Sequence, residues 1–200
     1  MTRKGFNIYK LKVSGNPGHD REAVSSVYAM LSAKRPGFTL RLDGNQGYTD
    51  RAFLEFLDYL QKRDYRIELF EQPLRKDDLK GFEVIRKYSH IPIILDETAI
   101  SLTDARRTIE HGLGDGINIK LAKSGINESA RIADLARQNG MKLMIGCMTE
   151  TMVGLSAAVS FAAGTGLFDY VDLDSIYFLY GKNEYPGIRR EDPAFVMNWE

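Results

Sequence analysis

A short apolar run, a turn and a stretch of helical spacing recur in that order along the whole chain. The segments between the apolar runs place apolar residues three and four positions apart, as in DRAFLEFLDYLQKRD (50–64). Strands that alternate with helices of this length form βαβ units and a parallel sheet. The number of repeats favours an α/β fold of the TIM-type (β/α) barrel, although the pattern alone also allows a doubly wound sheet. The expected strands are 6–13, 38–45, 66–73, 91–98, 116–123, 142–149 and 170–175.

Composition limits the functions that such a fold could serve. Of the 200 residues, 44% are hydrophobic, which suffices for one core, and no linker-like break divides the chain, so we expect a single domain over 1–200. The 27 basic and 27 acidic residues balance, which argues against a nucleic acid or an anionic membrane as the partner. The single cysteine, Cys147, excludes an internal disulfide framework and favours the cytoplasm.

Charged or polar side chains stand at the end of every expected strand. In a parallel barrel the carboxyl ends of all strands meet at one mouth, where active sites lie. The sequence therefore predicts that these seven side chains belong to one site. They are Lys12, Asp43, Glu71, Asp96, Lys120, Glu150 and Asp174.

Three successive strand ends carry carboxylates, at Asp43, Glu71 and Asp96. Each one alone is as well explained as a turn or helix-cap residue. Three on neighbouring strands would repel one another unless a cation lay between them. An all-oxygen ligand set fits Mg²⁺ better than zinc or copper, so the sequence predicts a magnesium site.

Lysines form the second part of the expected site. Lys10 and Lys12 share one face of their strand, and Lys120 ends another strand. Solvated lysines are the ordinary alternative, but lysine inside a β-rich apolar run is less usual. A neighbouring metal cation lowers the pKa of a lysine and makes it a plausible general base. Two such lysines suggest proton removal by one and proton return by the other, which is the chemistry of racemisation or epimerisation.

The motifs KLK, DGNQGY, FEQPL, LDET, NIKLAKSGI, GCMTET and DLD, taken in this order, resemble the muconate-lactonising subgroup of the enolase superfamily. Within it, they are most similar to the dipeptide epimerases of the L-Ala-D/L-Glu type. The resemblance implies a cytoplasmic, Mg²⁺-dependent isomerase. It would move a proton at the α-carbon of a dipeptide through a metal-stabilised enediolate, using two opposed lysines.

The resemblance also implies a role for each matching residue. The metal ligands would be Asp43, Glu71 and Asp96, and the acid/base pair would be Lys12 and Lys120. Lys10 would bind the substrate carboxylate, and Glu150 would line the mouth. Asn45 and Glu97 would orient the metal ligands. Asp172 and Asp174 would bind the free ammonium of the dipeptide.

The family's chains are longer and open with a capping domain and a first barrel strand, which have no counterpart in this sequence. We therefore expect an incomplete barrel of about seven strands without a capping domain, with weak Mg²⁺ binding and slow or no turnover. Apolar residues in the tail, including Trp199, suggest a homo-oligomer.

Alternative functions are those of o-succinylbenzoate synthase, N-acylamino acid racemase and muconate cycloisomerase, or of an inactive remnant that serves as an assembly partner.

Overall fold

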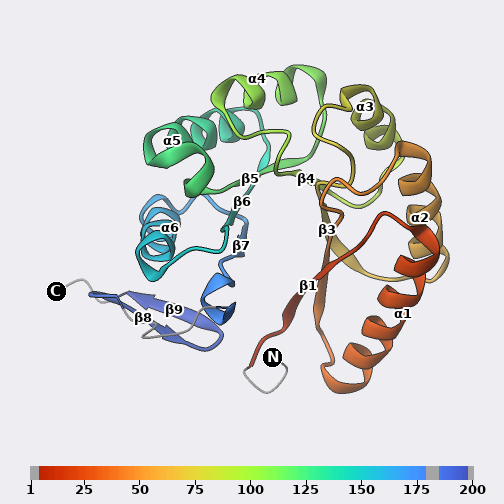
Figure 1. Cartoon of the computed structure of the whole chain (residues 1–200), viewed down its shortest axis with the longest axis horizontal. Helices are drawn as coiled ribbons and strands as arrows, with labels where there is room; N and C mark the ends of the chain where they lie inside the picture. The colour runs from red at the N-terminus through yellow and green to blue at the C-terminus, as the bar shows by residue number, and fades with distance from the viewer. Residues whose placement is uncertain (1–4, 179–184, 198–200) are drawn as a thin grey trace. The chain divides into compact units, whose positions relative to one another are not determined.

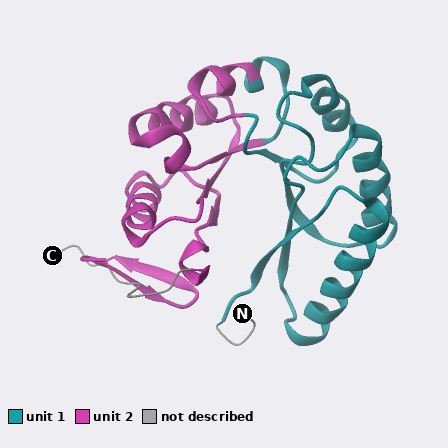
Figure 2. Cartoon of the chain, viewed as in Figure 1, with its two compact units in different colours: residues 1–98, 108–115 teal, residues 99–107, 116–200 magenta. Residues whose placement is uncertain are grey.

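The structure is a computed structural model of the chain and describes residues 5–178 and 185–197. It divides into two compact units, shown in Figure 2. Unit 1 comprises residues 1–98 and 108–115, and unit 2 comprises residues 99–107 and 116–200. The expectation of a single domain stays a prediction.

Unit 1 contains the first four parallel strands, which lie side by side in sequence order (Figure 1). The helices of this unit all lie along one face of the strands. The elements are β1 (Ile8–Lys12), α1 (Pro17–Lys34), β2 (Thr39–Asp43), α2 (Asp50–Lys62), β3 (Ile67–Glu71), α3 (Leu79–Tyr88) and β4 (Ile93–Leu95), and α4 (Leu102–His111) contributes residues to both units.

Unit 2 continues the alternation with three parallel strands and ends in an antiparallel hairpin. Its parallel strands also follow sequence order, with α5 and α6 on one side of them (Figure 1). The elements are β5 (Gly116–Ile119), α5 (Leu121–Gln138), β6 (Lys142–Gly146), α6 (Met152–Thr165), β7 (Tyr170–Asp172), the 3₁₀ helix η2 (Ser175–Phe178), β8 (Ile188–Glu191) and β9 (Ala194–Met197).

The helix α2 illustrates how the sequence produces this layering. Thr49 caps the helix, because its side-chain oxygen accepts a hydrogen bond from the backbone N–H of Ala52. The apolar residues Phe53 and Phe56 follow at helical spacing and are fully buried. The ring of Phe53 meets that of Phe70 on β3 edge to face, with 4.8 Å between centroids. Phe70 therefore faces the helices, and its neighbour in β3 faces the opposite side of the sheet.

The seven strands expected from the sequence are all present, with shorter bounds. Two details differ. The last expected strand ends at Asp172, so Asp174 lies in the link to η2 and not on a strand. The hairpin β8–β9 was not expected, because its first strand, IRRE, carries three charged residues and lacks the apolar character of the other strands. Trp199 lies outside the described residues.

Gly15 and Gly47 bring two turns of unit 1 into backbone contact. Gly15 has a φ of +85°, and a Cβ atom at this position would lie 2.0 Å from the carbonyl oxygen of Gly47. Only glycine permits both the conformation and the approach. The turn after β1 and the loop after β2 are thus packed backbone to backbone.

Among the helices in the described ranges, none has the length and apolar character needed to cross a membrane.

Candidate active site

Two buried carboxylates end neighbouring strands of unit 1. Asp43 is the last residue of β2 and Glu71 the last residue of β3, and the two are direct partners in the register of the sheet. Their exposed fractions are 4% and 1%. Buried like charges at adjacent positions are costly without a counter-charge.

Lysines of β1 supply that counter-charge in this structure. Lys12 pairs with Asp43 in the register, and its Nζ atom donates a 2.8 Å hydrogen bond to Asp43 Oδ2. The Nζ atom of Lys10 lies 3.1 Å from Glu71 Oε2 and 3.8 Å from Asp43 Oδ2. The positively charged ammonium group of Lys10 thus lies close to both carboxylates. The side chain of Lys10 is 17% exposed, whereas that of Lys12 is 65% exposed.

Asp96, the third predicted ligand, follows β4 directly and is buried. It lies two positions beyond Ile94, the register partner of Glu71, and so belongs to the same face of the sheet. Across the described residues, however, no three His, Cys, Asp or Glu side chains gather as a group that could hold a metal ion. The assignment of Asp43, Glu71 and Asp96 as a complete ligand set stays a prediction.

The chemistry of the three carboxylates nevertheless fits Mg²⁺. They are buried oxygen donors at or directly after the ends of consecutive strands, and the ammonium of Lys10 lies beside two of them. A hard divalent cation could take over this counter-charge role.

Two further predicted residues lie next to these carboxylates. The backbone N–H of Asn45 donates a 2.9 Å hydrogen bond to Asp43 Oδ1, so Asn45 contacts this carboxylate through its backbone. Its φ of +44° turns the chain back toward the strand end. Glu97 follows Asp96, and its Oε2 atom is buried with no hydrogen-bond partner among the described residues. The roles of both residues in orienting metal ligands stay predictions.

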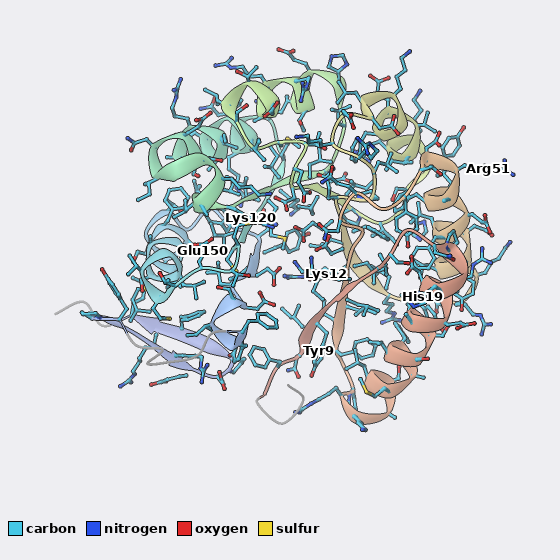
Figure 3. All side chains as sticks on the ribbon, in the orientation of Figure 1. Tyr9, Lys12, His19, Arg51, Lys120 and Glu150 are labelled. Carbon is cyan, nitrogen blue, oxygen red and sulfur yellow. The ribbon has the colours of Figure 1, made fainter. Side chains whose placement is uncertain are left out.

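Lys120 is the predicted site residue of unit 2 that follows β5 and stands at the N-terminus of α5 (Figure 3). Gly146, the last residue of β6, leaves room for it. A Cβ atom at Gly146 would lie 2.9 Å from Lys120 Cε and 2.5 Å from Asn118 Oδ1. The Lys120 side chain therefore packs against the glycine backbone at the end of the neighbouring strand.

Glu150 lies in the loop between β6 and α6, where its Oε1 atom accepts a 2.9 Å hydrogen bond from the backbone N–H of Met148. Gly154 leaves space for the carboxylate, since a Cβ atom there would lie 2.5 Å from Glu150 Oε2. This carboxylate is labelled in Figure 3 and is half-buried.

Asp172 and Asp174 flank the end of β7, with Asp172 half-buried and Asp174 exposed. The Cys147 thiol lies between them, 3.5 Å from the carbonyl oxygen of Asp172 and 3.9 Å from Asp174 Oδ1. Burial raises the pKa of Cys147, and the nearby carboxylates act in the same direction. The thiol therefore stays protonated near neutral pH and lines the wall instead of acting as a nucleophile.

Sequence reasoning missed two buried polar residues near the strand ends of unit 1. Gln72 follows Glu71 and is fully buried, and Asp20 in the first turn of α1 is fully buried as well. A fully buried acid or amide usually has a specific partner. The only available signal was their position directly after a strand or at a helix start, which many solvated residues share.

Comparison with known proteins places the chain in a family. The family model "Enolase C-terminal domain-like" matches residues 1–193. The chain belongs to the enolase C-terminal domain-like family. This confirms the resemblance inferred from the motifs and the expected barrel fold.

Among curated relatives, the L-Ala-D/L-Glu epimerase of Thermotoga maritima is 38% identical over 172 residues, which are 86% of this chain and 49% of the relative. The substrate-liganded L-Ala-D/L-Glu epimerase of Bacillus subtilis superposes with a TM-score of 0.92 at 29% identity, over 98% of this chain and 54% of that one. A dipeptide epimerase of Enterococcus faecalis, solved with Mg and the dipeptide L-Leu-L-Tyr, gives a TM-score of 0.89 at 32% identity, over 100% of this chain and 56% of that one. The chain spans about half the length of the curated relatives that it matches.

Proposed function

We propose that this chain forms the catalytic part of an Mg²⁺-dependent dipeptide epimerase of the L-Ala-D/L-Glu type. The observation that carries the proposal is the row of charges at the ends of β1, β2 and β3. There, Lys12, Asp43 and Glu71 are successive register partners, and Lys10 lies beside both carboxylates. The names of the curated relatives support the same activity.

Asp43, Glu71 and Asp96 would hold the metal ion. When bound, Mg²⁺ would stabilise the negative charge that develops on the substrate carboxylate as the α-proton leaves. The E. faecalis relative was solved with Mg, which supports this cofactor for the present chain. Metal binding would also release Lys10 from its role as the counter-charge of these carboxylates. Lys10 would then be free to bind the carboxylate of the substrate.

Lys12 and Lys120 would transfer the proton, one for each configuration of the α-carbon. Lys12 suits this role because its side chain is 65% exposed while a hydrogen bond from its Nζ atom to Asp43 Oδ2 restricts its position. Lys120 suits it because packing over Gly146 restricts its side chain.

Asp172 and Asp174 would bind the free ammonium group of the dipeptide. Two carboxylates near the end of β7 complement one ammonium, whereas an N-acylated amino acid has no such charge. This favours a dipeptide over the substrates of N-acylamino acid racemases. Glu150 would line the same part of the site. Homo-oligomer formation and a cytoplasmic location stay predictions.

Incubation of the purified chain with Mg²⁺ in D₂O tests the proposal, because α-proton exchange detects even slow turnover. We expect deuterium at the α-carbon of the glutamate residue of L-Ala-L-Glu, measured by NMR over hours at high protein concentration. Exchange of N-succinyl or N-acetyl amino acids without exchange of dipeptides would instead indicate a racemase. Mg²⁺ binding without exchange of any substrate would indicate an inactive remnant.

A further inference from the structure

Gln72 is a fully buried amide at the point where β3 leaves the sheet. Its backbone has a φ of +35°, which residues with a side chain rarely adopt. The side chain turns from there toward the segment that follows β4. A buried polar residue in a strained conformation calls for a specific compensating interaction.

The Gln72 side chain makes four hydrogen bonds. Its Oε1 atom accepts the backbone N–H groups of Asp96, at 2.9 Å, and Thr98, at 3.2 Å. Its Nε2 atom donates to the carbonyl oxygen of Leu74, at 2.9 Å, and to Thr98 Oγ1, at 2.7 Å. Two N–H donors on one side and a carbonyl on the other fix the orientation of the amide. The hydrogen-bonding capacity of the group is fully used.

The backbone of Gln72 extends this network in both directions. Its N–H donates to the carbonyl oxygen of Ile94, at 2.9 Å, and its carbonyl accepts the N–H of Gln46, at 2.8 Å. Gln72 directly follows β3. Its backbone carbonyl bonds to the segment after β2, and its backbone N–H and side chain bond to β4 and the segment after β4. These are the three strands that lead into the proposed metal ligands.

We propose that Gln72 is a positioning residue that holds Asp96 in place relative to Glu71 and thereby sets the Mg²⁺ affinity. It would act through the backbone N–H of Asp96 and not through the carboxylate proposed to bind the metal. This inference rests on the proposed function, because Asp96 matters in this way only if it binds the metal.

An apolar side chain without an amide group could not make the hydrogen bonds of Gln72 to the backbone of Asp96 and Thr98. Leucine at this position would leave the N–H groups of Asp96 and Thr98 buried without their acceptor, so the turn would shift to find other partners. Loss of a group that orients metal ligands typically weakens metal binding or activity by 10- to 100-fold. We expect Gln72→Leu to lower the Mg²⁺ affinity about tenfold or more.

Isothermal titration of the full chain with MgCl₂ measures this affinity, and NMR amide exchange measures the protection of the Asp96 and Thr98 N–H groups. We expect Gln72→Leu to weaken Mg²⁺ binding and to speed exchange at both amides. Gln46→Leu is the matched control, because Gln46 Oε1 accepts one backbone N–H, from Lys76 at 3.0 Å, and has no bond to Asp96. Ile85→Val, at a fully buried position of α3, controls for a general loss of stability.

Unchanged Mg²⁺ affinity in Gln72→Leu would overturn the proposal, and so would an equal loss in Ile85→Val. Failure of the unchanged chain to bind Mg²⁺ would count against the proposed function. In that event amide exchange decides about Gln72 alone: faster exchange confined to residues 96–98 would support its positioning role, and unchanged exchange there would overturn it.

Discussion

The hydroxyl of Tyr48 donates a 2.5 Å hydrogen bond to Oδ2 of the buried Asp20, joining the loop after β2 to the first turn of α1. The same carboxylate accepts the backbone N–H groups of Ser14 and Gly15, at 2.8 and 2.9 Å. Asp20 thereby ties together the two segments that follow the strands of Lys12 and Asp43. These hydrogen bonds, together with the His19 ring nitrogen Nδ1 at 3.4 Å from Oδ1, stabilise the negative charge of Asp20.

This network predicts an acid-sensitive contribution to stability. Burial raises the pKa of Asp20, but the hydrogen bonds from Tyr48 and Ser14 outweigh it and hold the pKa below its usual range. A carboxyl group with a lowered pKa in the folded state stabilises the protein above its unfolded pKa. That stabilisation is lost as the pH falls from about 4 through the folded pKa.

Tyr48→Phe tests the network. Removing the hydroxyl should lower the free energy of unfolding by about 1–3 kcal/mol at pH 7, because a hydrogen bond to a buried charge is lost. The difference from the unchanged chain should shrink in acid, where Asp20 is protonated. Urea unfolding at several pH values measures both effects. Tyr9→Phe is the control, since the Tyr9 hydroxyl donates to the neutral carbonyl of Phe6 and its loss should be independent of pH in this range.

Lys10 should compete with a metal ion for the carboxylates of Asp43 and Glu71. Lys10→Met removes the ammonium that lies 3.1 Å from Glu71 Oε2, so Mg²⁺ should bind several-fold more tightly while the metal-free chain becomes less stable. Titration calorimetry and thermal unfolding with and without MgCl₂ measure the two effects. Lys62→Met, which breaks an exposed pair with Asp58, should change neither. Weaker Mg²⁺ binding in Lys10→Met would show that the Lys10 ammonium does not compete with the metal ion for the carboxylates of Asp43 and Glu71.

Gly146→Ala should disturb the proposed proton transfer more than the fold. The new methyl group would lie 2.9 Å from Lys120 Cε, and a displacement of a reacting group by about 1 Å can cost 100-fold in rate. We expect a large drop in α-proton exchange with cooperative unfolding retained. Gly164→Ala in α6 meets nothing within 4 Å and should raise stability by about 0.5–1 kcal/mol without affecting exchange. Exchange at the rate of the unchanged chain would remove Lys120 from the mechanism.

Asp172→Asn and Asp174→Asn should weaken the binding of a dipeptide and leave the Mg²⁺ affinity nearly intact. Each substitution removes a negative charge from the proposed ammonium site, and neither residue belongs to the proposed ligand set. Titration with L-Ala-L-Glu and, separately, with MgCl₂ distinguishes the two effects. Loss of metal binding in either variant would mean that these residues do not form the ammonium site.

The sequence predicts the strands of this fold well because each one is a short, β-rich and mainly apolar segment, with a charged residue at its carboxyl end or shortly after it. Lys12, Asp43 and Glu71 were expected at strand ends and are the last residues of β1, β2 and β3. Local pattern was sufficient for β2 and β3, because residues 40–43 and 69–71 are buried and buried strands of a parallel sheet favour apolar runs.

Contacts between distant residues could not be predicted in the same way. Gln72 bonds to Thr98, 26 positions away, and Asp20 bonds to Tyr48, 28 positions away. Nothing in the local sequence distinguishes these side chains from solvated ones. The counter-charge that Lys10 provides was also missed, because it depends on the register of β1, β2 and β3 and on the lysine rotamer.

The contact between Gly15 and Gly47 also bears on how this end of unit 1 can change in evolution or by design. Because the two backbones touch, an inserted residue in either turn would push the other turn out of place. The two turns can therefore vary in length only together. Loop grafting intended to alter substrate choice should leave this pair intact and begin at connections that have no such partner.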